Sequence, residues 1–221
     1  METPLHLRLA NLTDRIETAA CKAGRDSATI RLIAVSKTQP RENIEALITA
    51  GHTCFGENKV QEAALKFETI EDRKQLELHL IGPLQTNKAK QAVRLFDMIH
   101  TVDRIELVDA LAKAMADTGH TPRFLIQVNT GREPQKAGVT PEALPELLAH
   151  CQRAHLYIEG LMCIPPVQAD PVLHFIKLAD LARQNGLKEL SMGMSNDFEA
   201  AIMAGATYVR VGTAIFGERS D

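Results

Sequence analysis

Lys37 is the residue whose type and position most plainly predict covalent chemistry. Residues 31–35 favour an extended chain and lead directly into Ser36 and Lys37, and Pro40 then opens a helical pattern, so the lysine is predicted to end a buried strand. Burial disfavours a charged ammonium group and lowers the pKa of a lysine, and a neutral amine attacks carbonyl groups. The first prediction is therefore that Lys37 forms a Schiff base.

A structural role is the alternative for Lys37. A lysine at a strand end commonly covers apolar surface with its methylene groups while its ammonium group stays in water. For this stretch taken alone, that is the more common outcome. The choice between the two depends on the residues at the other strand ends.

Two turns rich in small residues predict a site for a phosphate group. Residues 191–196 lead from a predicted strand into a helix with Ser195 at its N-cap, and residues 211–217 repeat the arrangement around Gly212 and Thr213. Glycine lets the backbone approach a ligand closely, and the N–H groups at a helix start bind anions together with nearby hydroxyls. The alternative is that Ser195 and Thr213 only cap their own helices.

Strand alternation adds Arg210 to this group of residues. If Gly212 faces a ligand, Arg210 and Tyr208 share its inward face, with Arg210 nearer the mouth and Tyr208 one layer below. A guanidinium group does not release its proton, so Arg210 would give a pyridine ring little power as an electron sink.

The composition is that of a globular chain without a broad basic surface. The 221 residues are 45% hydrophobic and 24% charged, with a net charge of −3, which argues against nucleic acid or anionic lipid as a partner. No apolar run approaches the ~18 residues that span a bilayer, and no targeting segment precedes the first helix. The four cysteines are far apart and favour neither a metal site nor disulfides, which predicts a cytoplasmic protein: Cys21, Cys54, Cys151 and Cys163.

The elements that would position these residues alternate along the chain. Apolar spacing predicts an amphipathic helix over residues 4–22, and eight strand-and-helix units follow it. The predicted strands cover residues 31–36, 53–56, 78–82, 97–102, 123–129, 156–163, 188–192 and 207–212. Eight such units close a parallel sheet, so we expect an α/β fold, a (β/α)8 TIM-type barrel that forms a single domain over 1–221, with residues 1–30 carrying an extra N-terminal helix packed on it.

Helix patterns and turn residues support this division. The predicted helices cover residues 41–50, 58–69, 85–95, 104–117, 141–153, 170–185 and 197–204, with a short helix at the C-terminus. Residues 103–106 have the pattern of a capping box, and four glycines stand where helices should end: Gly51, Gly119, Gly186 and Gly205.

In such a barrel the carboxyl ends of the strands converge on one mouth, where ligands bind. Strand 1, which carries Lys37, is the neighbour of strand 8 in the closed sheet. An aldehyde that also carries a phosphate would reach both Lys37 and the two small-residue turns.

Several segments together resemble the pyridoxal phosphate homeostasis protein family, whose fold is like the barrel domain of alanine racemase. The matching segments are residues 32–38, 55–62, 79–82, 84–88, 99–103, 160–162, 190–195 and 209–217. The resemblance implies a monomer that carries pyridoxal 5′-phosphate as an internal aldimine on Lys37. It further implies a role in vitamin B6 and amino-acid homeostasis, without established turnover, with apo forms of enzymes that use this cofactor as partners.

The resemblance also implies roles for further residues. It puts the phosphate at Ser195, Gly212 and Thr213, puts Arg210 near the pyridine nitrogen, and lines the ring pocket with Asn58 and Met162. Those last two have packing or capping as an alternative. The chain departs from the family pattern at Leu80, Pro83 and Asn196, and Lys136 lies in a loop that could reach the mouth or stay in solvent.

Two enzymatic readings compete with a cofactor carrier. An amino-acid racemase needs a second acid–base group opposite the lysine, and alternation turns Tyr157 toward the helices and leaves Tyr208 deep in the barrel. A Schiff-base aldolase needs carboxylates around the amine, and the strand ends offer mainly Glu57. Three further side chains remain conceivable substitutes for the tyrosines: His100, Thr101 and Cys163.

Overall fold

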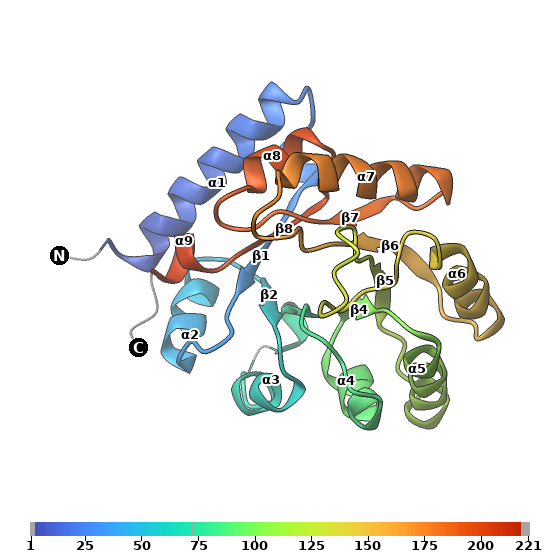
Figure 1. Cartoon of the computed structure of the whole chain (residues 1–221). Coiled ribbons are helices and arrows are strands. Elements are labelled where there is room, and N and C mark those ends of the chain that lie inside the picture. The colour runs from blue at the N-terminus through green and yellow to red at the C-terminus, as the bar shows by residue number, and fades with distance from the viewer. Residues whose placement is uncertain (1–2, 72, 218–221) are drawn as a thin grey trace.

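Eight parallel strands close into a barrel in the computed structural model, which describes residues 3–71 and 73–217 (Figure 1). The strands are β1 Arg31–Val35, β2 Cys54–Glu57, β3 Glu77–Leu80, β4 Met98–Val102, β5 Arg123–Gln127, β6 Ile158–Met162, β7 Glu189–Ser191 and β8 Tyr208–Val211. Each strand pairs with the next along the chain, and β8 pairs with β1. The predicted (β/α)8 barrel is therefore confirmed.

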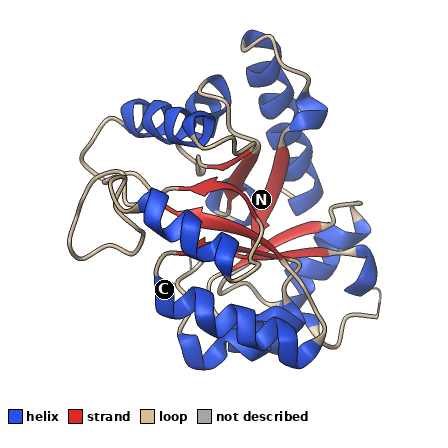
Figure 2. Ribbon diagram, turned by 90° about the vertical axis from the view of Figure 1, so that its right-hand side faces the viewer, coloured by secondary structure: helices blue, strands red, loops and turns tan. Residues whose placement is uncertain are grey.

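Helices surround the strands, as Figure 2 shows. They are α1 Leu5–Lys22, α2 Arg41–Thr49, α3 Val60–Phe67, α4 Ala89–Leu95, α5 Ile105–Thr118, α6 Leu144–Arg153, α7 Pro171–Gln184, α8 Phe198–Met203 and α9 Thr213–Phe216. Three single turns of 3-10 helix lie at Ser27–Thr29, Arg73–Gln75 and Thr86–Lys88. None of these described helices combines the length and apolar composition that crossing a membrane requires.

The N-terminal helix α1 lies along the outside of the barrel beside α8 and α9 (Figure 1). Leu12 and Ile16 are buried on one face together with Ala19 and Ala20, at the spacing of successive helical turns. The first helix of the chain is thereby in contact with the two elements that follow β7 and β8.

The apolar core is divided into two parts by the barrel wall. The larger part lies between strands and helices, and the smaller part fills the barrel interior with Ile33, Cys54, Met98, Leu125, Met162 and Tyr208. In β8, Val209 and Val211 belong to the outer part, so the alternate residues Tyr208 and Arg210 face inward. The predicted inward face of β8 is therefore present.

Helix ends agree better with the sequence than helix starts do. Gly51, Gly119, Gly186 and Gly205 have φ values of 88°, 70°, 67° and 103°, the left-handed conformation that ends a helix. The predicted capping box at 103–106 is wrong, because the N-cap of α5 is Arg104 and not Asp103. The Asp103 carboxylate instead accepts a hydrogen bond from the Arg104 guanidinium. The helix predicted from residue 141 begins at Leu144 instead.

The start of α8 also differs from the prediction. Ser195 is not its N-cap, since the helix begins at Phe198 and Asp197 precedes it. The backbone N–H of Met194 donates to Asp197 Oδ1 over 2.6 Å, which closes a turn before the helix can start. Ser195 therefore lies within a turn.

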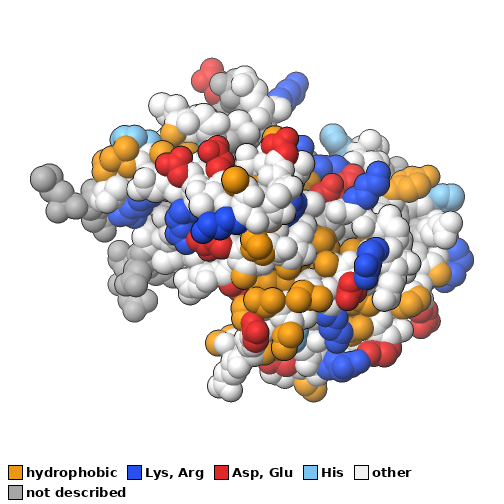
Figure 3. Space-filling model, turned by 90° about the horizontal axis from the view of Figure 1, so that it is seen from above, with side chains coloured by type: hydrophobic (Ala, Val, Ile, Leu, Met, Phe, Trp, Pro, Cys, Tyr) orange, Lys and Arg blue, Asp and Glu red, His pale blue; other side chains and the backbone are white. Residues whose placement is uncertain are grey.

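Charged side chains of both signs interleave on the face seen in Figure 3, around a group of hydrophobic ones. This face therefore carries no electrostatic field of a single sign, in keeping with the net charge of −3.

A glycine in the barrel wall offers a test of the fold. A Cβ atom at Gly160 of β6 would lie 1.9 Å from the carbonyl oxygen of Glu189 in β7. We expect Gly160→Ala to lower the free energy of unfolding in urea by about 2–3 kcal/mol, because strand backbones must separate. Gly119→Ala, where a Cβ meets nothing within 4 Å, is the control and should cost only about 1 kcal/mol for its positive φ. Equal losses would contradict the tight β6–β7 contact.

Candidate functional site

A cavity of about 680 Å³ opens at the carboxyl ends of the strands. Its lining brings together most of the residues that the sequence singled out, from β8 and the loops after β1, β2, β7 and β8: Lys37, Asn58, Ser195, Arg210, Gly212 and Thr213. Met162 is not among the lining residues, because it is fully buried inside the barrel. Residues separated by more than half of the chain thus share one mouth.

Lys37 stands on a constrained piece of backbone. It is half-buried and follows directly after the buried Ser36. The next residue, Thr38, has φ of 63°, which is an unusual conformation for a β-branched side chain. The backbone N–H of Thr38 donates to Glu62 Oε1 in α3, and this contact holds the strained turn in place.

A partly buried ion network lies behind this turn. Lys66 Nζ in α3 donates to Ser36 O over 2.8 Å, to Glu57 Oε1 over 3.0 Å and to Glu62 Oε1 over 2.6 Å. The Ser36 hydroxyl donates to the same Glu57 oxygen over 2.7 Å. Because the network contacts Ser36 and Thr38, it fixes the backbone on both sides of Lys37. The sequence did not reveal it, since Glu62 and Lys66 have the i, i+4 spacing of an ordinary surface pair.

Glu57 serves this network and does not line the cavity. Its side chain has no exposed surface, and burial raises its pKa although Ser36 and Lys66 lower it. Within the described residues Glu57 Oε2 has no hydrogen-bond partner. The carboxylate that the aldolase hypothesis requires is thus paired with Lys66.

Arg210 is a buried cation held by neutral groups. Its side chain donates to Ser191 Oγ over 2.6 Å and to the carbonyl oxygen of Cys163 over 2.8 Å, and the residue is 4% exposed. Among the residues that the structure describes, no carboxylate forms an ion pair with it. Burial lowers the pKa of Arg210, and a guanidinium nevertheless stays protonated in proteins. A hydrogen-bond acceptor in the cavity would therefore meet a cation without a direct ion-pair partner among the described residues, although the charge of Asp197 raises the pKa of Arg210.

The loops after β7 and β8 form the part of the cavity next to the end of β1. A Cβ atom at Gly212 would lie 3.4 Å from Val35, so this turn packs closely against the end of β1. α9 begins at Thr213, and the first N–H groups of a helix have no acceptor within it. Ser195 adds a hydroxyl, while Asp197 adds a carboxylate to the same lining.

α1 contributes a cation near this end. Arg15 borders a second, shallower hollow together with Ser195 and Thr213, and it forms an ion pair with Glu199 of α8. The sequence did not predict that Arg15 lies near the site, because Arg15 belongs to the first helix and comes close only through the contact of α1 with α8.

The remaining wall is largely apolar. Ile81 and the segment 164–167 line the cavity, and Val167 is 95% exposed at its rim. Lys136 reaches this mouth as the sequence allowed, where it donates to Pro165 O over 3.2 Å and pairs with Glu133 over 2.7 Å. An apolar wall with a few polar groups is typical of small-molecule sites.

The candidate acid–base groups of a racemase lie away from this lining. Tyr157 was expected to face the helices, but it precedes β6 at the other end of the barrel and is 80% exposed. Tyr208 is buried and accepts a hydrogen bond from Arg123 over 3.1 Å. Burial raises the pKa of Cys163 to about 12, and the hydroxyl of Thr101 donates to Gly82 O over 2.9 Å.

Comparison with known proteins gives a consistent result. The family model described as alanine racemase, N-terminal domain, matches residues 7–220. The pyridoxal phosphate homeostasis protein of Aquifex aeolicus is 41% identical over 222 residues, which cover 96% of this chain and 97% of that protein. The protein of the same name from Escherichia coli K12 is 41% identical over 226 residues, covering 96% and 95%. PipY of Synechococcus elongatus, solved with PLP bound, has a TM-score of 0.83 at 36% identity and covers 97% of this chain and 100% of that one.

The ion network makes a prediction about pH. Because the pKa of Glu57 is raised in the folded protein, its stabilising contribution is complete below its ordinary value of 4.5 and is lost as the pH rises through the raised pKa. Glu57→Gln should therefore gain stability relative to the wild type as the pH increases from about 4 to about 8, measured by urea unfolding.

Glu62→Gln is the matched control with the opposite sign. Burial raises the pKa of Glu62, but hydrogen bonds from Lys66 and the Thr38 N–H outweigh it and the net pKa is lowered. Glu62 therefore stabilises the fold above its ordinary pKa, and the variant should lose stability relative to the wild type as the pH rises. Parallel trends in the two variants would refute the assignment.

Proposed function

Because the chain belongs to the pyridoxal phosphate homeostasis protein family, we propose that it holds pyridoxal 5′-phosphate in the cavity at the barrel mouth, covalently attached to Lys37. Its role would be to carry this cofactor in vitamin B6 and amino-acid homeostasis and to release it to apo-enzymes. The observation that carries the proposal is that Lys37 lines the same cavity as Arg210 and the two small-residue turns.

The residues present fit this cofactor. The cavity of about 680 Å³ lies within the range of roughly 300–1,000 Å³ that is usual for small-molecule sites. When bound, the cofactor supplies an aldehyde that condenses with an amine and a pyridine ring that withdraws electrons. Lys37 offers the amine, and Arg210 offers a charged N–H donor for a ring nitrogen.

The phosphate would lie at the end formed by the loops after β7 and β8. Ser195 and Thr213 supply hydroxyls there, and Gly212 allows the backbone N–H groups at the start of α9 to approach the anion. Asn58 lines the cavity and would flank the ring. Met162 is fully buried and would not touch the cofactor. It would act only through the next residue, Cys163, whose carbonyl oxygen accepts a hydrogen bond from Arg210.

A carrier fits this site better than a racemase does. Arg210 keeps its proton and therefore does not promote protonation of a ring nitrogen, which limits the electron sink that racemisation needs. Tyr157, Tyr208 and Cys163 all lie outside the cavity lining. We further propose that the chain works as a monomeric single domain in the cytoplasm, which its free cysteines support.

Borohydride reduction tests the attachment. After incubation with pyridoxal 5′-phosphate and reduction, we expect mass spectrometry to find the cofactor on the peptide that contains Lys37. Lys37→Ala should lose both this modification and the visible absorption band. Lys136→Ala is the matched control, because Lys136 lines the same cavity, and it should keep them. Modification of Lys37→Ala to the wild-type level would overturn the proposal, and rapid racemisation of single-enantiomer amino acids would favour the enzyme.

The phosphate end makes a separate prediction. Hydrogen bonds to a charged group contribute more than neutral ones, so Ser195→Ala and Thr213→Ala should each weaken binding of pyridoxal 5′-phosphate by about tenfold. Pyridoxal, which lacks the phosphate, should bind wild type and variants alike in a fluorescence titration. An equal loss for both ligands would show that these residues do not contact the phosphate.

A further inference from the structure

A column of polar side chains crosses the interior of the barrel beneath Arg210. Ser191 of β7, His100 of β4 and His79 of β3 have no exposed surface. The apolar residues next to them along the strands belong to the outer core: Leu78 and Leu80, Ile99, and Leu190 and Met192. The side chains of Ser191, His100 and His79 therefore face inward. Buried polar groups of this kind are almost always hydrogen-bonded, and the direction of each bond decides what the column can do.

The column is continuous at hydrogen-bond distance. Arg210 donates to Ser191 Oγ over 2.6 Å, and Ser191 Oγ lies 2.9 Å from His100 Nδ1. His100 Nε2 lies 2.8 Å from His79 Nδ1. His79 Nε2 then lies 3.2 Å from Glu77 Oε1, at the end of the barrel opposite the cavity. Each side chain therefore contacts the next from one end of the interior to the other.

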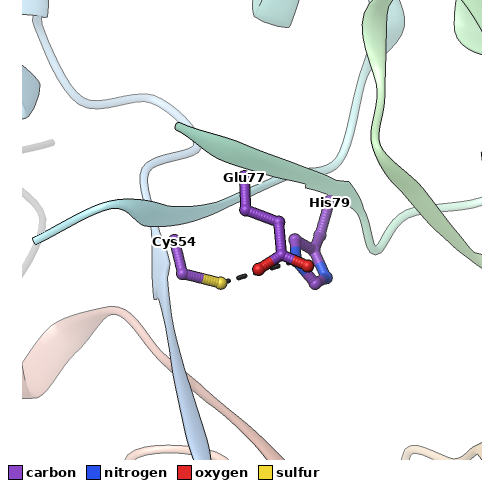
Figure 4. A group of neighbouring side chains, drawn as sticks. All are labelled: Cys54, Glu77 and His79. Carbon is purple, nitrogen blue, oxygen red and sulfur yellow. Dashed lines mark hydrogen bonds and ion pairs between the residues drawn. The ribbon is translucent and has the colours of Figure 1, made fainter. Parts of the chain in front are cut away.

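The lower end is drawn in Figure 4, where the thiol, carboxylate and imidazole of Cys54, Glu77 and His79 are directed toward one another. Cys54 Sγ lies 3.4 Å from His79 Nε2. The Glu77 carboxylate also pairs with Arg31 and Arg123, which approach from β1 and β5. The column thus ends on a carboxylate that two arginines hold.

The two ends favour one direction for the bonds between them. Arg210 can only donate to Ser191, and the Glu77 carboxylate, 3.2 Å from His79 Nε2, favours a hydrogen on that nitrogen. The Ser191 hydroxyl accepts from Arg210, and its hydrogen points to Nδ1 of His100. Nε2–H of His100 then donates to Nδ1 of His79, whose Nε2–H faces Glu77. In this arrangement Ser191, His100 and His79 Nδ1 each have a partner, and His79 Nε2–H faces Glu77 Oε1 at 3.2 Å, an oxygen that no hydrogen bond of the described residues satisfies.

The reverse arrangement satisfies the column less well. If Nδ1 of both histidines carried the hydrogen, the lone pair of His79 Nε2 would face the Glu77 oxygen at 3.2 Å with only the weak thiol donor of Cys54 beside it, and the Ser191 hydroxyl would lose His100 as its acceptor. That arrangement is also the one a metal ion would need at His79 Nε2, with Cys54 and Glu77 as further ligands. Arg31 and Arg123 beside Glu77 oppose an added cation.

We propose that Ser191, His100 and His79 form a one-directional chain of hydrogen bonds that ends beside the Glu77 carboxylate and positions Arg210, with both histidines neutral and protonated on Nε2. The effect on a bound cofactor rests on the proposed function, whereas the chain itself does not. Charged histidines would place three neighbouring cations in the dry interior, where like charges repel strongly. The column therefore orients the Arg210 guanidinium through neutral side chains and adds no charge next to it.

The surroundings support neutral histidines. Burial lowers the pKa of His79 to about 3, against a smaller opposing effect of Asp97, and Arg31 lowers it further. Burial, His79 and Arg210 all lower the pKa of His100. Tyr208 packs against both rings, at 5.6 Å and 5.7 Å between ring centroids. Together with Cys54 and Glu77, these groups complete the shell around the pair.

Nitrogen-15 NMR of histidine-labelled protein tests the chain without any cofactor. We expect the long-range spectrum to show His79 and His100 as neutral Nε2–H tautomers, unchanged between about pH 5 and pH 8. His79→Gln and His100→Gln identify the signals. Adding Zn²⁺ should leave the signals unchanged. An Nδ1–H tautomer, a titration in this range, or a shift of His79 on zinc binding would each overturn the proposal.

Cofactor binding tests the positioning role. His100→Leu interrupts the chain, whereas a glutamine side chain can still accept at one atom and donate from the other. We expect His100→Leu to weaken binding of pyridoxal 5′-phosphate by about tenfold and to shift the absorption maximum of the bound cofactor, with His100→Gln retaining both. His120→Leu, at an exposed site, is the control. Circular dichroism and melting of the cofactor-free variants monitor folding.

The outcomes separate the two proposals. Wild-type affinity and spectrum in a folded His100→Leu would overturn the positioning role. If the NMR tautomers are found but the wild type binds no cofactor, the chain stands and the proposed function fails. If the wild type binds the cofactor but the tautomers differ, the function stands and the chain fails.

Discussion

The pairing of β1 with β8 is the contact on which the site depends. Ile33 lies opposite Arg210 and Ala34 opposite Val211, so the first strand and the last are fixed in register although most of the chain separates them. The loop that carries Lys37 therefore meets the turn that carries Gly212 and Thr213. Closure of the barrel, rather than any local motif, places Lys37 and the two small-residue turns at one mouth.

The backbone around Lys37 is held by the partly buried ion network of Glu57, Glu62 and Lys66. Lys66 is surrounded by oxygen atoms of Ser36, Glu57 and Glu62, and it fixes the backbone around Lys37 from behind. Such a network costs desolvation, and the raised pKa of Glu57 reflects that cost. What it provides is a defined position for the strained Thr38 and hence for the lysine before it.

The sequence predicts the elements better than the contacts between them. Period-two and period-3.6 patterns depend on neighbouring residues, so all eight strands and the inward face of Arg210 were predictable. The contacts of Lys66 and Arg15 depend on residues far away in the chain, and their local spacing resembles that of surface charges. The capping role expected of Ser195 failed because Asp197, two residues later, forms the competing turn with Met194. Met162 lies in β6 as predicted, but its side chain is buried in the barrel interior and does not line the cavity.

Neutral partners explain how Arg210 can serve a ligand. A carboxylate beside the guanidinium would satisfy it and weaken its attraction for any acceptor in the cavity, whereas Ser191 and the Cys163 carbonyl orient it and leave its charge intact. Ser191 in turn needs an acceptor for its own hydrogen, and a neutral histidine provides one without adding charge. The nearest acid of the column, Glu77, lies at the far end of the barrel, where Arg31 and Arg123 balance it. The polar half of the interior thus separates Arg210 from Glu77, and Arg210 forms no direct ion pair with a carboxylate of the described residues.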